Sequence, residues 1–225
     1  MKKSVFRNCF AYLVTSLIVT LFTVPSAHSA LIGVGGPLSN IGTPAAIIGA
    51  PALINNITVT NTGQQGFDEM QNVLLGAALA VDAGNIASGM TVDSHMIFFN
   101  RTPGSGAASH FNVQWTFSGT ILGVMSDSNG NLEAASNGIL GAAGTIYPGA
   151  FINRGLETLT DGYSVLGSVL TVGMRVSSPG DWIRVVTASS TLSVIPLPAG
   201  LPLYGAGIAL LSFIGWCRRS RPTMP

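Results

Sequence analysis

Apolar and polar residues alternate along the middle of the chain with the two-residue period of a β-strand. The clearest alternation spans residues 110–117, which we predict to form a strand with one buried and one solvent-facing side. Stretches 54–60, 92–100, 163–176 and 182–188 are rich in apolar and β-branched residues and are also predicted to be strands. Within 110–117 the predicted buried residues are Phe111, Val113, Trp115 and Phe117.

Residues 69–81 fit two alternatives. Their methionine, glutamine, leucine and alanine residues favour a helix by propensity, but Gly76 interrupts the stretch. A turn is predicted at 82–85, and the next strand follows soon after it. We therefore prefer a strand for residues 69–81 and keep a helix as the alternative.

Turn-forming residues separate the predicted strands. Gly167 and Ser168 divide one pair of Val-rich runs, and the Ser-Pro-Gly sequence at 178–180 divides the next. Many short strands with turns between them predict an all-β fold, a single β-sandwich or jelly-roll-like domain. We place this domain at residues 63–193, after a Gly-, Pro- and Ala-rich lead-in at 30–62 that carries the first strand.

The N-terminal 29 residues contain an uncharged apolar run at 10–24. A basic head precedes this run, and Pro25 and small residues follow it, which is the layout of a secretory signal peptide. The small-x-small pattern predicts cleavage after Ser29, with cleavage after Ala30 as the second choice. The body is therefore expected to be exported from the cytoplasm.

The C-terminal residues 194–225 form a second, three-part signal. Residues 201–216 are apolar and uncharged, and a helix of this length would measure about 24 Å, so we predict a single transmembrane helix. The basic residues after it are predicted to stop transfer and to stay in the cytoplasm. The preceding Pro-x-Pro element is Pro196, Leu197 and Pro198, and the basic cluster is Arg218, Arg219 and Arg221.

The C-terminal sequence VIPLPAGLPLYGAGIALLSFIGWCRRSR resembles the VPLPA variant of the PEP-CTERM sorting signal of Gram-negative bacteria, with Ile195 inserted between Val194 and Pro196. The resemblance implies that an exosortase recognises and cleaves the tail in the inner membrane. It also implies release to the cell surface or an exopolysaccharide matrix. The stretches VDSHMIFFN, WTFSGTILGVMSD and PGDWIRVVT resemble the central domain of some such proteins. Signal peptidase, exosortase and exopolysaccharide are thus the expected partners.

Charge and cysteine content narrow the function classes of the body. Between the two terminal signals lie four basic and nine acidic residues, a net charge of 4 − 9 = −5, which argues against nucleic-acid binding. The two cysteines, Cys9 and Cys217, both lie in the terminal segments. The body therefore has no disulfide and no thiolate nucleophile or metal ligand.

Residues 127–133 are the best candidate for a metal site. Side-chain oxygens of Asp127, Asn129, Asn131 and Glu133 alternate around a glycine and could bind Ca²⁺. However, the EF-hand spacing is absent, and Asn-Gly is the commonest dipeptide of a two-residue hairpin turn. We favour the turn and expect no cofactor.

Catalytic residues are not evident. Asp93 and His95 would share one face of a strand, and a structural hydrogen-bonded pair is favoured over a general base. His110 belongs to no metal-binding motif, and Ser105 lacks the G-x-S-x-G motif of a nucleophilic serine. The adjacent carboxylates of residues 68 and 69 would face opposite sides of a strand and cannot form the acid pair of a glycosidase.

Three functions remain open. The first is an exported surface or matrix protein without catalytic activity, held briefly in the inner membrane and then sorted. The second is a secreted carbohydrate-binding or carbohydrate-active protein, in which Trp115 or Trp182 would stack on sugar rings. Core burial is favoured for both tryptophans because each lies within an apolar strand pattern. The third is a membrane protein whose C-terminal helix is never cleaved.

Overall fold

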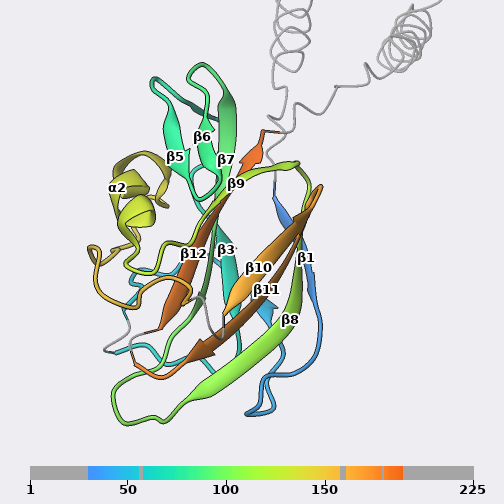
Figure 1. The fold of residues 1–225 in the computed structure, drawn as a ribbon, viewed down its shortest axis with the longest axis vertical. Coiled ribbons are helices and arrows are strands. Elements are labelled where there is room, and N and C mark those ends of the chain that lie inside the picture. The colour runs from blue at the N-terminus through green and yellow to red at the C-terminus, as the bar shows by residue number, and fades with distance from the viewer. Residues whose placement is uncertain (1–29, 56–57, 158–160, 179, 190–225) are drawn as a thin grey trace, which may run out of the picture. The chain divides into compact units, whose positions relative to one another are not determined.

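The computed structural model describes residues 30–55, 58–157, 161–178 and 180–189. The predicted signal peptide and the C-terminal sorting signal lie outside these residues. The described residues form a mostly β structure with one helix, α2 (Asn131–Leu140), as the predicted all-β class requires (Figure 1). No helix in this part of the chain has the length and apolar character needed to cross a bilayer.

Two larger sheets and one hairpin make up the β structure (Figure 1). The four-stranded sheet has the order β1 (Leu31–Gly35), β8 (Ala108–Phe117), β11 (Val169–Val176) and β10 (Gly162–Leu166). The six-stranded sheet has the order β2 (Ala46–Ile47), β3 (Gln65–Asp68), β7 (Thr91–Phe99), β12 (Asp181–Ala188) and β9 (Ile121–Met125), with β4 (Val73–Leu74) also pairing with β7. The hairpin joins β5 (Leu79–Val81) to β6 (Gly84–Ile86).

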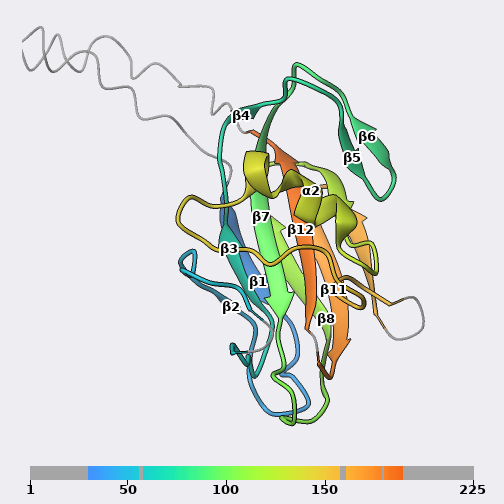
Figure 2. The same ribbon diagram turned by 90° about the vertical axis from the view of Figure 1, so that its left-hand side faces the viewer.

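The six-stranded sheet is buried on both faces. On β7, Ile97 and Phe99 pack in the apolar core shared with the four-stranded sheet, whereas Met96 and Phe98 pack in a second cluster on the opposite face. Figure 2 shows α2 in front of β7 and β12 on that opposite face. Strands β7 and β12 are therefore buried almost continuously, as expected for strands covered on both sides.

The first strands lie earlier than the sequence predicted. The expected strand at 54–60 does not form in the described residues of that stretch, and an isolated bridge pairs the preceding Leu53 with Ile146. Ile54 instead buries its side chain completely in the cluster on the helix-facing side of the six-stranded sheet. The lead-in contributes β1 and β2, and β1 is an edge strand paired with β8.

Other predicted strands agree with the structure. The ambiguous stretch 69–81 contains β4 and β5, which confirms the strand assignment over the helix. The predicted turn at 82–85 connects β5 to β6. Gly167, which has a φ of 62°, lies in the turn between β10 and β11 as predicted.

Strand β8 departs from simple alternation. Val113, Trp115 and Phe117 are buried as predicted, but Phe111 is 41% exposed. Asn112 has a φ of 58°, and the register between β8 and β11 shifts beside it, so a bulge reverses the alternation at this point. His110 thereby takes the buried position.

Candidate functional site

The predicted turn is present at residues 127–130, where the Gly130 amide donates to the Asp127 carbonyl (2.7 Å), but it leads into α2 and does not join two strands of a hairpin. The two carboxylate oxygens of Asp127 accept hydrogen bonds from the amides of Asn131 (2.8 Å) and Leu132 (2.9 Å), in the first turn of α2. Gly130 precedes the helix with a left-handed φ of 64°. Glu133 points into the protein and pairs with Arg154 (2.7 Å). The carboxylates of Asp127 and Glu133, two of the four groups considered as calcium ligands, therefore accept hydrogen bonds from the protein's own donors.

The Asp127 contacts predict a measurable loss of stability on truncation. Replacing Asp127 by alanine should lower the free energy of unfolding by about 0.5–2 kcal/mol, because it removes the acceptor for two amides at the start of a helix. Urea denaturation followed by circular dichroism would measure the change. The neighbouring Ser128 is exposed, so its alanine variant should change stability by less than about 0.5 kcal/mol. Equal effects of the two substitutions would contradict this role.

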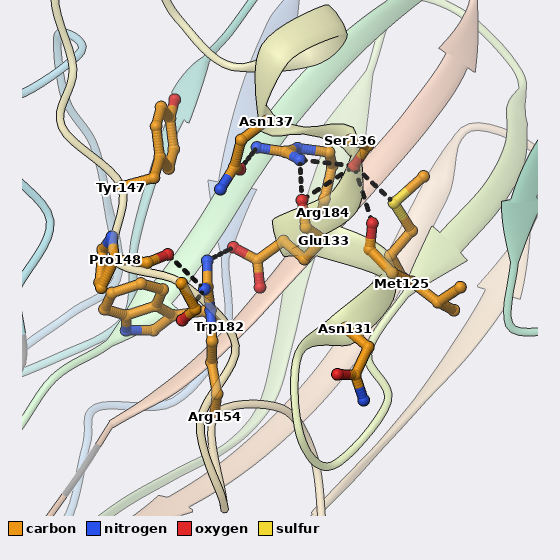
Figure 3. Close-up of polar contacts among 12 residues, drawn as sticks. Met125, Asn131, Glu133, Ser136, Asn137, Tyr147, Pro148, Arg154, Trp182 and Arg184 are labelled. Atoms are coloured by element: carbon orange, nitrogen blue, oxygen red, sulfur yellow. Dashed lines mark hydrogen bonds and ion pairs between the residues drawn. The ribbon is translucent and has the colours of Figure 1, made fainter.

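A buried ionic network, made of Glu69, Glu133, Arg154 and Arg184, connects the six-stranded sheet to α2. Figure 3 shows the part of this network formed by Glu133, Arg154 and Arg184. Arg184, on β12, donates to both carboxylate oxygens of Glu69, at 2.6 and 2.8 Å. Its guanidinium also donates to the carbonyl of Glu133 (2.7 Å) and to Ser136 Oγ (2.7 Å) on α2. The carboxylate of Glu69 and the polar groups of α2 thus surround Arg184 from two sides.

Arg154 completes the network from the segment that follows α2. Its Nη2 donates to Glu133 Oε1, and its Nη1 donates to the carbonyls of Pro148 and Gly149 (2.6 Å each). The guanidinium carbon lies 4.5 Å from the ring centroid of Trp182 (Figure 3). Burial raises the pKa of Glu133, and the two arginines oppose that rise without cancelling it. The two arginines therefore balance the charges of the two buried carboxylates. Because the four residues come from β12, α2 and two connecting segments, their bonds hold these parts of the fold together.

His95 is bonded to Asp68, and the predicted pair with Asp93 does not form. His95 Nδ1 lies 2.7 Å from an Asp68 carboxylate oxygen, and Nε2 lies 3.0 Å from Thr187 Oγ1, so both ring nitrogens are occupied. Burial alone would raise the pKa of Asp68, but hydrogen bonds from His95 and the Leu31 amide lower it. The predicted separation of residues 68 and 69 onto opposite faces is confirmed, since Glu69 contacts Arg184.

The order Asp68, His95, Thr187 is the order of acid, base and hydroxyl in nucleophilic catalysis. The distances also match that arrangement. However, His95 and Thr187 are both fully buried, and the imidazole packs against Phe117 with its centroid 4.8 Å away. A substrate would have to enter the core to reach Thr187. We interpret the three residues as a polar connection among β3, β7 and β12.

The remaining residues selected from the sequence have structural contacts. Trp115 and Trp182 are fully buried, which confirms the predicted core positions. Trp115 Nε1 donates to Gln64 Oε1 (3.0 Å), and the Gln64 amide donates to His110 Nδ1 (3.1 Å). Ser105 lies in a short turn, where its hydroxyl donates to the carbonyl of Thr102 (2.5 Å).

Three carboxylates that the sequence did not single out lie together. Glu157, Asp161 and Asp181 each place one oxygen within 4.8 Å of the other two. Burial and the neighbouring Asp161 and Glu157 raise the pKa of Asp181 to about 10. Burial and a hydrogen bond with Asp161 raise the pKa of Glu157 to about 7. We call Glu157, Asp161 and Asp181 the carboxylate cluster.

The carboxylate cluster is a candidate site for a cation or for shared protons, because three negative charges at this separation repel one another. Sequence spacing places Glu157 and Asp161 near each other, but Asp181 lies twenty residues further on, and no motif connects it to them. The structure does not join the cluster to the candidate residues at 127–133, whose carboxylates have the separate partners described above. No protein-family model matches this chain, and no curated protein or solved structure matches it either.

Proposed function

We propose that this chain is an exported protein of the bacterial cell surface or exopolysaccharide matrix, without catalytic activity of its own. In this proposal an exosortase sorts and cleaves the chain, and the body is a β-sandwich released from the inner membrane. The basis is the pair of terminal signals in the sequence, together with the resemblance of residues 194–221 to a PEP-CTERM signal. The net negative charge of the body suits a soluble exported domain.

The observation that carries this proposal is the pair of terminal signals in the sequence, and the contacts of the residues next to them show what cleavage would leave in place. Strand β1 starts at Leu31, directly after the predicted cleavage sites, and the amides of Ala30 and Leu31 donate to Ser118 Oγ (2.8 Å) and Asp68 Oδ1 (2.9 Å). At the other end, Ser189 Oγ donates to Asp93 (2.8 Å), before the Pro-x-Pro element. Cleavage at both predicted signals would therefore leave intact all the strands that the structure describes.

Exposure of Trp115 or Trp182 beside carboxylates would favour the carbohydrate-binding alternative, and burial of both counts against it. Both side chains are fully buried, and their indole nitrogens donate to Gln64 and Asn100 inside the protein. Neither tryptophan can stack on a sugar ring without unfolding its strand. We therefore do not propose a carbohydrate-active function for this chain.

The proposal is tested by measuring the mass and the terminal peptides of the protein from its native host. Strains with and without the exosortase should be compared. We expect a mature chain that starts at residue 30 or 31, and in the exosortase-positive strain ends near Pro196–Pro198. In the exosortase-deficient strain the residues after this element should be retained.

Two outcomes would contradict the proposal. A mature chain that still contains Trp216 in both strains would exclude sorting by an exosortase. A chain that begins at Met1 and remains in the cytoplasm would exclude export. A variant in which Pro196 and Pro198 are both replaced by alanine provides the matched control, because it should export normally and escape C-terminal cleavage.

A further inference from the structure

The three members of the carboxylate cluster come from three separate segments of the fold. Glu157 follows residues 154–156, whose amides donate to the carbonyls of Ser126 and Ser128. Asp161 immediately precedes β10 and accepts a hydrogen bond from the amide of Arg175 on β11. Asp181 is the first residue of β12 and is paired with Phe99 on β7. The cluster therefore joins the edge of the four-stranded sheet to the six-stranded sheet.

Asp181 has a buried carboxylate oxygen that lacks a partner. The residue is only 2% exposed, and its Oδ2 accepts no hydrogen bond from any of the described residues. A buried carboxylate oxygen without a donor is costly, since burial removes its hydration and nothing replaces it. The charges that act most strongly on it are those of Asp161 and Glu157, which increase the cost. Among the described residues nothing supplies Oδ2 with a donor, and a bound cation would remove this cost.

We propose that Glu157, Asp161 and Asp181 bind a Ca²⁺ ion. All three donors are carboxylate oxygens, the hard ligands that Ca²⁺ prefers, whereas Zn²⁺ sites usually include nitrogen or sulfur. Calcium bonds of about 2.3–2.6 Å put ligand oxygens on opposite sides of the ion about 4.6–5.2 Å apart. Oxygens that all lie within 4.8 Å of one another can therefore share one such ion. Water molecules would complete its coordination.

Calcium is favoured over magnesium because of how the ligands are supplied. Glu157 lies in a loop, Asp161 directly precedes β10 and Asp181 is the first residue of β12. Ca²⁺ tolerates the irregular coordination that such ligands give. Mg²⁺ demands a near-ideal octahedron and keeps most of its water. Three carboxylates without a complete protein cage correspond to the weak calcium sites of extracellular modules, with a Kd of about 10⁻⁴–10⁻³ M. This inference does not depend on how the protein is sorted.

Bound calcium would connect the segment after α2, the β10 edge and β12. A cation would remove the repulsion among the three carboxylates and would give the buried Oδ2 of Asp181 a partner. We therefore expect calcium to stabilise the folded state against unfolding.

The test uses the full chain, purified in a mild detergent and treated with EGTA. Isothermal titration with CaCl₂ should give one site with a Kd of about 10⁻⁴–10⁻³ M. At 100 times the Kd, the melting temperature should rise by about 5–10 °C. MgCl₂ at the same ionic strength should give a much smaller rise. The absence of binding and of a calcium-dependent rise would overturn the proposal, as would an equal response to magnesium.

Two variants connect the response to these residues. Asp181→Asn should not lower the melting temperature of the calcium-free protein, because the amide has nearly the shape of the carboxyl and carries no charge to be repelled, and it should weaken calcium binding at least about tenfold. Glu157→Gln, at a partly exposed position, should weaken binding similarly and provides the test if the first variant does not fold. If either folded variant kept the calcium response of the natural chain, the assignment would be wrong.

Asp127→Asn is the matched control, because it changes the same chemical group in the segment that the sequence suggested as a calcium loop. It should lower the melting temperature through the weakened start of α2 and retain the full calcium-dependent rise. Loss of the calcium response in this control, with the response retained in Asp181→Asn, would place the ion at residues 127–133 and overturn the proposal.

Discussion

Replacing Arg184 by methionine is expected to lower the free energy of unfolding by about 3–5 kcal/mol. The variant leaves the carboxylate of Glu69 buried without its two guanidinium bonds, and it removes the donors to α2. The loss is a large fraction of the about 5–15 kcal/mol that stabilises a typical domain. Urea denaturation followed by circular dichroism would measure it.

The same substitution at Arg175 is the control. Arg175 is exposed on β11, so Arg175→Met should change stability by about 0.5 kcal/mol or less. The double variant Glu69→Leu with Arg184→Met removes both buried charges and should recover part of the loss. If Arg184→Met cost no more than Arg175→Met, the network would contribute nothing to the fold. If the double variant lost more free energy of unfolding than Glu69→Leu and Arg184→Met lose together as single variants, the two residues would not act as an ion pair.

Trp115→Ala is the second substitution with a large expected effect, a loss of about 3–5 kcal/mol in the free energy of unfolding. The indole is fully buried between the sheets and lies against Gly66, where an added Cβ would be only 2.7 Å from Cζ3. Truncation would leave a cavity and would also leave Gln64 Oε1 without its indole donor. Urea denaturation gives the loss, and native-state hydrogen exchange of β8 would show whether the strand itself opens more easily.

Phe111 on the same strand provides a comparison that the sequence pattern would not suggest. Simple alternation makes Phe111 and Trp115 equivalent core residues, whereas the bulge leaves Phe111 41% exposed above Gly173. Phe111→Ala should therefore cost about 1 kcal/mol or less. A loss close to that of Trp115→Ala would contradict the bulge at Asn112.

Several strands could be predicted because their residues carry the pattern locally. The alternation in 113–117, the β-branched residues of β11 and β12 and the turn at Gly167 depend only on near neighbours along the chain. The predicted burial of Trp115 and Trp182 depends on the same pattern. The prediction of a strand at 54–60 failed because an apolar, β-branched stretch can also lie in a loop and bury a single side chain, as Ile54 does.

The candidate site was less predictable than the strands. His95 was expected to bond Asp93, two residues away, but it bonds Asp68 from a neighbouring strand. Residues 127–133 were expected to form a hairpin turn because Asn-Gly is typical of one. The side chain of Asp127 instead accepts hydrogen bonds from the first amides of α2. Whether the chain continues as a helix or as a hairpin after this turn depends on the elements that α2 packs against.

The sequence by itself determined the mostly β character of the body, because strand patterns and turn residues act over short distances. It also determined the charge balance and the terminal signal patterns, which are properties of composition and order. Only the tertiary structure decided which charged groups meet. Glu69 lies 115 positions from Arg184, and Asp181 joins Glu157 and Asp161 across two sheets. The cost of burying these groups without partners is fixed by contacts between distant segments, and no local pattern in the chain records those contacts.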